Sequence, residues 1–314
     1  MKLLPVLSLA ALGLAPRLQA ATITDVISNV SVCDPVVSST TCRSSQNSGA
    51  TQSTTTFATR FSDSTGTVDG SGTAFSDRGT TRLQTNVIVN RQVGTRLASS
   101  AHADVFIQDI LNQPFDWGFD LPFASITGGF DASGVGVVSS GTEVKYFPEG
   151  KLVIGYRLTA RNGSGQVTQF LADGQTFTYS SPGTAINETA AFSIRGLKGG
   201  TDYEFFITIG FDGGVLYQAV GGSGGAIGDA HYSVTGDLSH TILLGAATVY
   251  DANGVALPNS LVGASGYDYT VGANSGGGGS TAVPEPGTVA LTFGGLALVV
   301  YSRRRTGHHL AERY

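Results

Sequence analysis

The stretch Tyr203-Glu204-Phe205-Phe206-Ile207-Thr208-Ile209-Gly210-Phe211 decides the fold of this chain. Every second residue in it, starting from the tyrosine, is large and apolar. Successive side chains of a β-strand point to opposite faces of a sheet, whereas the apolar residues of a helix recur every three or four positions. The stretch therefore predicts a long strand with one buried face. Asp212-Gly213-Gly214 follows it, and this sequence is expected to turn the chain into a further strand.

The same alternation occurs elsewhere in the chain. Residues 83–89 place Leu83, Val87 and Val89 on one face, and residues 151–160 repeat the pattern up to the hairpin signal Asn162-Gly163. Further strands are expected at 166–171 and 175–180, joined by a turn at Asp173-Gly174, and at 232–236, 239–250 and 267–271. Residues 44–56 are low in complexity and predict a loop, whereas residues 105–111 fit either a short helix or a strand.

The composition agrees with strands and turns. The 314 residues include 44 glycines and one methionine, and only 13% are charged. Helices favour Glu, Lys, Leu, Ala and Met, whereas Thr, Ser, Val and Gly dominate here. We therefore predict one antiparallel β-sandwich over residues 21–274, of the jelly-roll or fibronectin-like type. Leu197, Gly199, Thr201 and Tyr203 resemble the corner of fibronectin-type sandwiches in which a tyrosine hydroxyl bonds the preceding turn; an ordinary strand-turn-strand is the alternative.

Cys33 and Cys42 are the only cysteines of the chain. If the chain is exported, their proximity predicts a disulfide that ties down residues 34–41. In the chain-entropy picture, a loop this short contributes roughly 2.5–3 kcal/mol. Neither a third metal ligand nor a base lies near them in the sequence.

Net charge argues against one class of partner. The chain has 18 basic and 23 acidic residues, and residues 21–286 keep 12 of the basic and 22 of the acidic ones. A nucleic-acid-binding protein needs a basic surface, so no nucleic-acid partner is expected. An acidic surface permits cation-bridged contact with anionic polymers, although it more often serves solubility.

The N-terminus reads as an export signal. Lys2 precedes an apolar run from Leu3 to Leu14, and Leu18-Gln19-Ala20 fits a cleavage site before Ala21. We therefore expect residues 1–20 to be a signal peptide handled by the Sec translocon and signal peptidase.

The C-terminus has three consecutive parts. Val283, Pro284, Glu285 and Pro286 form a short motif, and an uncharged apolar run follows it as far as Ser302. Arg303, Arg304 and Arg305 then resist translocation, which predicts a single transmembrane helix with a cytoplasmic tail at 306–314. Residues 275–282 form a Gly/Ser linker before the motif.

This order of motif, apolar helix and arginines resembles a PEP-CTERM sorting domain over residues 283–305. Residues 231–254 also resemble the β-hairpin that often precedes such a tail. The resemblance implies a Gram-negative source, recognition by an exosortase at the inner membrane, cleavage near Pro284–Pro286, and release to the cell surface or an exopolysaccharide matrix. Residues 306–314 extend beyond the arginines, where members of that family usually end.

Candidate chemistry in the body is sparse. Trp117, flanked by Asp116 and Asp120, fits either a sugar-stacking site or the core, and the core is the stronger interpretation. The Gly221–Gly228 loop lacks the residues of a phosphate-binding loop. A glycosidase needs two carboxylates, and the candidates by residue type are Glu143, Glu149, Glu188 and Glu204. A serine-type triad would use His102, His231 or His240, each of which lies near an aspartate in the sequence: Asp104, Asp229 and Asp237. A calcium site could use Asp229, Asp237 and Asp251.

No motif pairs these carboxylates, places a nucleophile beside a histidine, or forms a calcium loop. The sequence therefore predicts an exported structural or adhesive surface protein, with no catalytic residues, cofactor or metal. Its expected partners are an exosortase, the inner membrane through the C-terminal helix, and exopolysaccharide as a candidate ligand. The alternatives are a carbohydrate-binding or polysaccharide-active secreted protein, and a permanently anchored single-span membrane protein.

Overall fold

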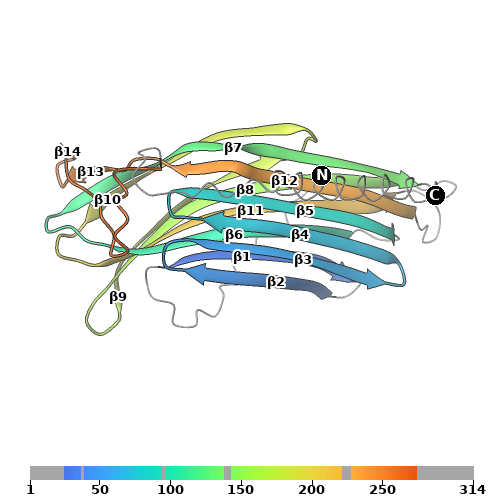
Figure 1. Ribbon diagram of the computed structural model, residues 1–314, viewed down its shortest axis with the longest axis horizontal. Helices are drawn as coiled ribbons and strands as arrows, with labels where there is room; N and C mark the ends of the chain where they lie inside the picture. Colours follow the sequence, from blue (N-terminus) through green and yellow to red (C-terminus); the bar gives the residue numbers. More distant parts are fainter. Residues whose placement is uncertain (1–24, 37–38, 94–96, 138–142, 221–227, 274–314) are drawn as a thin grey trace, which may run out of the picture. The chain divides into compact units, whose positions relative to one another are not determined.

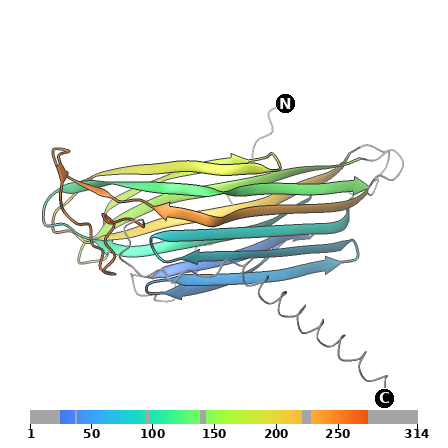
Figure 2. The ribbon, with the colours of Figure 1, turned by 45° about the horizontal axis from the view of Figure 1, so that its top comes forward.

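The computed structural model describes residues 25–36, 39–93, 97–137, 143–220 and 228–273, and within these ranges the chain forms strands and turns without a helix. Two antiparallel sheets share one hydrophobic core (Figure 1). Figure 2 shows the long strands of both sheets running along a common direction. The predicted all-β antiparallel class is thereby confirmed. The predicted signal peptide, the Gly/Ser linker, the segment 283–305 and the tail all lie outside the described residues.

The six-stranded sheet has the order β2-β1-β6-β11-β8-β9. Its strands are β2 (Ser39–Gly49), β1 (Val26–Val36), β6 (Leu97–Leu111), β11 (Tyr203–Val220), β8 (Glu143–Arg161) and β9 (Val167–Tyr179).

The eight-stranded sheet has the order β14-β13-β7-β12-β5-β4-β3, with β10 paired to β7. Its strands are β3 (Ser53–Asp63), β4 (Gly66–Ser76), β5 (Thr80–Val93), β12 (Gly228–Leu244), β7 (Trp117–Val137), β10 (Thr184–Leu197), β13 (Thr248–Asp251) and β14 (Ala256–Leu257). These sheets hold more strands than the seven or eight of fibronectin-like and jelly-roll sandwiches, so neither predicted subtype describes this strand order.

The core follows from the two-residue alternation of the strands. The inward residues of β11, from Tyr203 to Tyr217, are buried, as are Val87 on β5 and Val234 on β12 in the opposite sheet. Gly236 on β12 leaves room for the ring of Phe211, since a Cβ there would lie 1.8 Å from that ring. The expected alternating strands at 83–89, 151–160 and 203–211 are confirmed.

The tyrosine corner predicted at Tyr203 is present. Its hydroxyl accepts a hydrogen bond from the Lys198 backbone amide at 2.8 Å and donates one to Gln169 Oε1 at 2.7 Å. The Tyr203 side chain is fully buried, so the bond fixes the turn that leads into β11.

Several predicted turns and loops are strands. Residues 44–56 belong largely to β2 and β3, because inward-facing hydroxyls satisfy one another: Ser28 bonds both Ser53 and Thr55 at 2.8 Å. Residues 105–111 are part of β6. Asp212-Gly213-Gly214 and Asp173-Gly174 lie inside β11 and β9, since both strands continue to pair through them.

The C-terminal part of the described chain also differs from expectation. A turn at Asn253-Gly254 joins β13 to β14, and Gly254 has φ +80°. Residues 267–271 do not form a strand; only an isolated bridge joins Val262 to Asp268. Asp268 instead accepts hydrogen bonds from the Thr270 amide and hydroxyl, which makes a local turn.

The predicted disulfide between Cys33 and Cys42 is present, with an S–S distance of 2.07 Å. The two cysteines are register partners across the antiparallel pair of β1 and β2. The bridge therefore fixes the register of the hairpin at its closed end.

Side chains of one sheet cap the carbonyls of the other along both edges of the sandwich. On one edge, Arg43 and Asn47 of β2 donate to the Arg60 and Thr54 carbonyls of β3 at 3.1 and 3.0 Å. On the other edge, Gln169 of β9 donates to the Gly196 carbonyl of β10 at 3.0 Å, and Gln175 donates to the Ala191 carbonyl at 3.3 Å.

A buried carboxylate closes the end of the sandwich that carries β13 and β14 in Figure 1. Asp109, an inward residue of β6, accepts hydrogen bonds from Arg78 at 3.3 Å and from the Tyr269 hydroxyl at 3.0 Å. The Ser265 amide and hydroxyl also donate to it, at 3.0 and 2.5 Å. Asp109 thus binds the closing segment 258–273, which has almost no strand pairing of its own, to the sheet.

The Asp109→Ala variant should lose about 3–5 kcal/mol of unfolding free energy, because it leaves the buried Arg78 guanidinium without its carboxylate. The matched control is Asp69→Ala, which removes the exposed Arg60–Asp69 pair and should cost no more than about 1 kcal/mol. Urea unfolding followed by the fluorescence of Trp117, the one tryptophan of the chain, measures both. Equal losses in the two variants would contradict the role assigned to Asp109.

Candidate functional site

A cluster of titratable and amide side chains lies on the outer face of the six-stranded sheet and is defined by Asn29, His102, Asp104 and Asp212. His102 Nε2 lies 3.1 Å from Asp104 Oδ2, and the Asn29 amide donates to the same oxygen at 3.0 Å. Asp212 is the register partner of His102 on β11. Gly210 makes room for the imidazole, since a Cβ there would lie 3.3 Å from the ring. Strands β1, β6 and β11 thus bring together residues that are far apart in sequence.

The imidazole of His102 holds its proton more tightly in this cluster than free histidine does. Desolvation opposes the charged imidazole, but the hydrogen bond and charge of Asp104 and the charge of Asp212 outweigh it and raise the pKa of His102. Desolvation also raises the pKa of Asp212, against the charges of His102 and Lys151. Among the described residues, His102 Nδ1 and Asp212 Oδ1 are buried without a hydrogen-bond partner.

The three candidate histidines do not assemble a serine-type triad within the described part of the chain. His102 does pair with Asp104, as their sequence spacing allowed, and Ser31 is its register partner on β1, but no hydrogen bond joins that hydroxyl to the imidazole. His231 lies on the outer face of the other sheet, with Nδ1 3.1 Å from Asn90 Oδ1. The side chain of His240 lies outside the described residues.

Trp117 belongs to the core. It is 1% exposed, stacks on Phe119 with ring centroids 5.5 Å apart, and meets Tyr203 edge-on at 6.4 Å. The possible carbohydrate contact at Trp117 is therefore wrong, because the indole faces the opposite sheet rather than solvent. The flanking aspartates make local bonds: Asp116 pairs with Lys198, and Asp120 accepts from Arg195 and Tyr250.

The candidate carboxylates remain separate. Glu204 pairs with Arg161, and Glu188 accepts from the Tyr179 hydroxyl at 3.3 Å on a different strand. Glu149 lies on β8, and the side chain of Glu143 lies outside the described residues.

The aspartates considered for calcium are also dispersed. Asp229 and Asp237 lie eight positions apart on β12, and Asp237 accepts from the Ser239 amide at 2.8 Å. Asp251 caps its own turn by accepting from the Asn253 and Val255 amides. Among the residues that the structure describes, no group of three His, Cys, Asp or Glu side chains is arranged to hold a metal ion.

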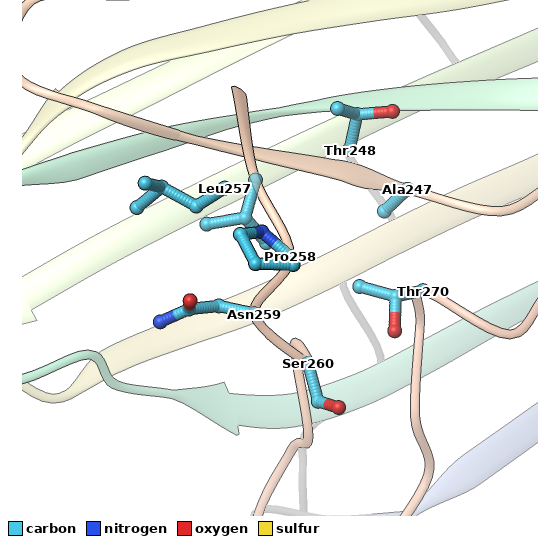
Figure 3. A pocket seen from close by; sticks show the side chains of 8 residues that line it. Ala247, Thr248, Leu257, Pro258, Asn259, Ser260 and Thr270 are labelled. Carbon is cyan, nitrogen blue, oxygen red and sulfur yellow. The ribbon is translucent and has the colours of Figure 1, made fainter. Parts of the chain in front are cut away.

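A small hollow of about 300 Å³ lies between β13 and the closing segment (Figure 3). It is lined by Thr248, Leu257, Asn259, Ser260 and Thr270, together with neighbouring backbone. None of the lining residues is ionisable, so the hollow has no acid, base or charged group with which to promote a reaction.

The outer face of the eight-stranded sheet carries a flat array that sequence reasoning missed. Neighbouring outward positions of β3, β4, β5 and β12 hold hydroxyl and amide side chains in register. The alternation of Thr54 and Thr56 with the buried Ser53 and Thr55 was the available signal, but their low complexity favoured a loop. We call six of these residues the hydroxyl–amide patch: Thr56, Ser71, Thr73, Gln84, Asn86 and Thr235.

Comparison with known proteins gives no family. No family model matches the chain, and no curated protein matches it. Among solved structures, the enzymatically active domain of tailspike protein 4 from bacteriophage CBA120 is 13% identical, covering 55% of this chain and 20% of that one, with a TM-score of 0.16. The Gx strain of infectious bursal disease virus gives 8% identity, 70% and 66% coverage and a TM-score of 0.09.

This chain therefore spans only one fifth of the length of the tailspike chain it resembles. Likenesses this distant define neither its fold nor its activity. The sorting residues Val283, Pro284, Glu285 and Pro286 and the arginines 303–305 lie outside the described residues. Within the described ranges, no helix is long and apolar enough to cross a membrane.

The Trp117→Ala variant should lose about 3–5 kcal/mol of stability, because it empties a buried site between the sheets. Phe170→Ala is the matched control, since that ring is 59% exposed and its loss should change stability by no more than about 0.5 kcal/mol. Chemical unfolding followed by circular dichroism measures both. Similar small effects would show that Trp117 reaches solvent.

The His102 cluster should make stability depend on pH. Because the folded-state pKa of His102 is raised above 6.5, its contribution is complete below that value and is lost as the pH rises through the folded pKa. Asp212, whose pKa is also raised, works in the same direction at lower pH. The stability difference between the wild type and His102→Gln should therefore be larger at about pH 5.5 than at about pH 9. His231→Gln is the control, and an equal pH dependence in both variants would contradict the assignment.

Proposed function

We propose that this protein is an exported structural or adhesive component of a bacterial cell surface or extracellular matrix. It enters the Sec pathway through residues 1–20, is held at the inner membrane by its C-terminal helix, and is released after an exosortase cuts near Pro284–Pro286. The sequence resemblance of residues 283–305 to a PEP-CTERM domain supports the route.

The single observation that carries the structural part is the form of the body. Its long strands present two extended outer sheet faces, while the one hollow described above has no ionisable lining. Proteins that bind or transform a small molecule usually enclose it in an apolar cavity with a few convergent polar groups. Extended polar faces favour contact with a large partner instead.

The Cys33–Cys42 disulfide supports export. Disulfides persist in oxidising compartments such as the periplasm and the cell exterior, and are rare in the cytosol. The acidic balance of residues 21–286 supports solubility outside the cell and disfavours a nucleic-acid partner.

The route is tested by the mass of the protein in the matrix fraction of a Gram-negative host, with and without its exosortase. We expect a form that lacks residues 1–20 and ends near Pro284–Pro286, and only when the exosortase is present. The Pro284→Ala/Pro286→Ala variant should stay in the membrane fraction, whereas Pro258→Ala, in the body, should be processed normally. A matrix form that still ends at Tyr314 would refute processing, and a membrane location that ignores both exosortase and prolines would identify a permanent anchor.

A further inference from the structure

The two outer faces of the sandwich differ in chemistry. The face of the six-stranded sheet carries charged and aromatic groups, such as Lys151 and Arg157, whose guanidinium lies 4.1 Å from the centre of the Phe206 ring. The corresponding face of the eight-stranded sheet carries the hydroxyl–amide patch. The six residues of the patch are all uncharged, although Arg60, Asp69, Arg82 and Asp237 occupy outward positions of the same face around them.

Backbone pairing fixes the geometry of the patch. Thr73 on β4 is the register partner of both Thr56 on β3 and Gln84 on β5. In the next outward row, Asn86 on β5 lies between its partners Ser71 on β4 and Thr235 on β12. Neighbouring strands lie about 4.8 Å apart, so each row is a line of evenly spaced polar groups across the sheet.

Most of the hydrogen-bonding capacity of the patch is unused. Thr56 and Thr73 share one long contact at 3.4 Å, and Thr235 donates to Asn86 Oδ1 at 3.3 Å. Among the described residues, the Gln84 amide and the Ser71 hydroxyl have no side-chain partner. Hydroxyl and amide groups both donate and accept, so a partner whose groups do the same would satisfy the patch.

Charge narrows the class of partner. Two rows adjoin the patch. One contains Arg60 and Asp69, which neutralise each other in a bidentate pair, and the other contains Arg82, whose guanidinium lies 5.9 Å from the centre of the Phe75 ring. Asp237, the register partner of Gln84, already accepts a hydrogen bond from the Ser239 amide. The six residues of the patch include neither a cationic side chain nor an aromatic ring. An uncharged surface whose groups both donate and accept hydrogen bonds is best matched by an extended, uncharged chain that is rich in hydroxyl groups.

We propose that the hydroxyl–amide patch is the binding surface of this protein for a neutral polysaccharide. This proposal names the ligand of the proposed surface protein. It rests on the proposed function only in assuming that the protein reaches a location where such a polymer is present. Polymer hydroxyls accept from the Gln84 and Asn86 amides and donate to the threonine and serine oxygens. Because the contacts are neutral, the binding should not depend on ionic strength.

The test measures retention of the full-length protein, in mild detergent, on two neutral polymers, amorphous cellulose and agarose, and on the acidic polymer alginate. Thr56→Lys/Thr73→Lys places two long cations in the patch and should weaken retention roughly tenfold, which corresponds to about 1.4 kcal/mol. The matched control is Thr176→Lys/Thr178→Lys, which makes the same change at exposed outward positions of β9 on the other sheet. The control should bind like the wild type, and both variants should unfold at the same urea concentration as the wild type. Retention should be unchanged between about 0.05 and 0.5 M salt.

Several outcomes would overturn the proposal. No retention on either neutral polymer would remove it, as would equal loss in the patch and control variants. Retention only on alginate, with loss at high salt, would identify an acidic ligand. If sedimentation shows a dimer that the patch variant alone abolishes, the occupant is a second copy of the chain. A negative binding result would not change the mass of the processed protein in the matrix fraction. Failure of the polysaccharide proposal is therefore distinguishable from failure of the proposed export route.

Discussion

Two-residue alternation, maintained over unusually long strands, is the constraint on which this structure depends. In β11, which runs from Tyr203 to Val220, every inward side chain from Tyr203 to Tyr217 must fit the opposite sheet. A slip of one residue in pairing would move all of them to the outer face, so the register of each strand is specified by the burial of its neighbours. The outer positions carry no such demand, and their composition can therefore differ between the two sheets.

Polar groups at both ends of the core reinforce that register. At one end, Asp109 holds Arg78 and the closing segment; at the other, Asp34 accepts two hydrogen bonds from Arg91, which also reaches Asp63 at 2.7 Å. A buried carboxylate without its partners is costly, so only the arrangement that satisfies both Asp109 and Asp34 is stable. The disulfide between register partners on β1 and β2 adds a covalent constraint of the same kind.

The sequence predicted what depends on apolar periodicity and failed where polar residues fill strands. The face of β11, the turn after Asn162 and the tyrosine corner were predictable because each rests on a short, local pattern. In that turn, the Gly165 amide donates to the Asn162 carbonyl at 2.8 Å. Strands β2 and β3, which lie in different sheets, were not, since the buried Ser53 and Thr55 of β3 bond Ser28 of β1, which is distant in sequence. Glycines within β9 and β11 were misread as turns, because the partner strands that keep them extended cannot be seen from the sequence.

For the candidate sites too, the sequence predicted local features but not contacts between distant strands. The proximity of His102 and Asp104 followed from their spacing of two, but Asn29 and Asp212 come from other strands and only the fold unites them. Trp117 stood out by its residue type, and tertiary packing then placed it in the core. The hydroxyl–amide patch could not be predicted, because a row across a sheet has no signature along the chain.

The capping of both sandwich edges has a consequence for self-association at high protein concentration. An unprotected edge strand can recruit another copy of the same protein, and repeated addition yields open-ended fibrils. Here Arg43 and Asn47 occupy carbonyls of β3, while Gln169 and Gln175 occupy those of β10. Copies concentrated side by side would therefore remain discrete particles, and the cohesion of such a layer would have to come from contacts between faces.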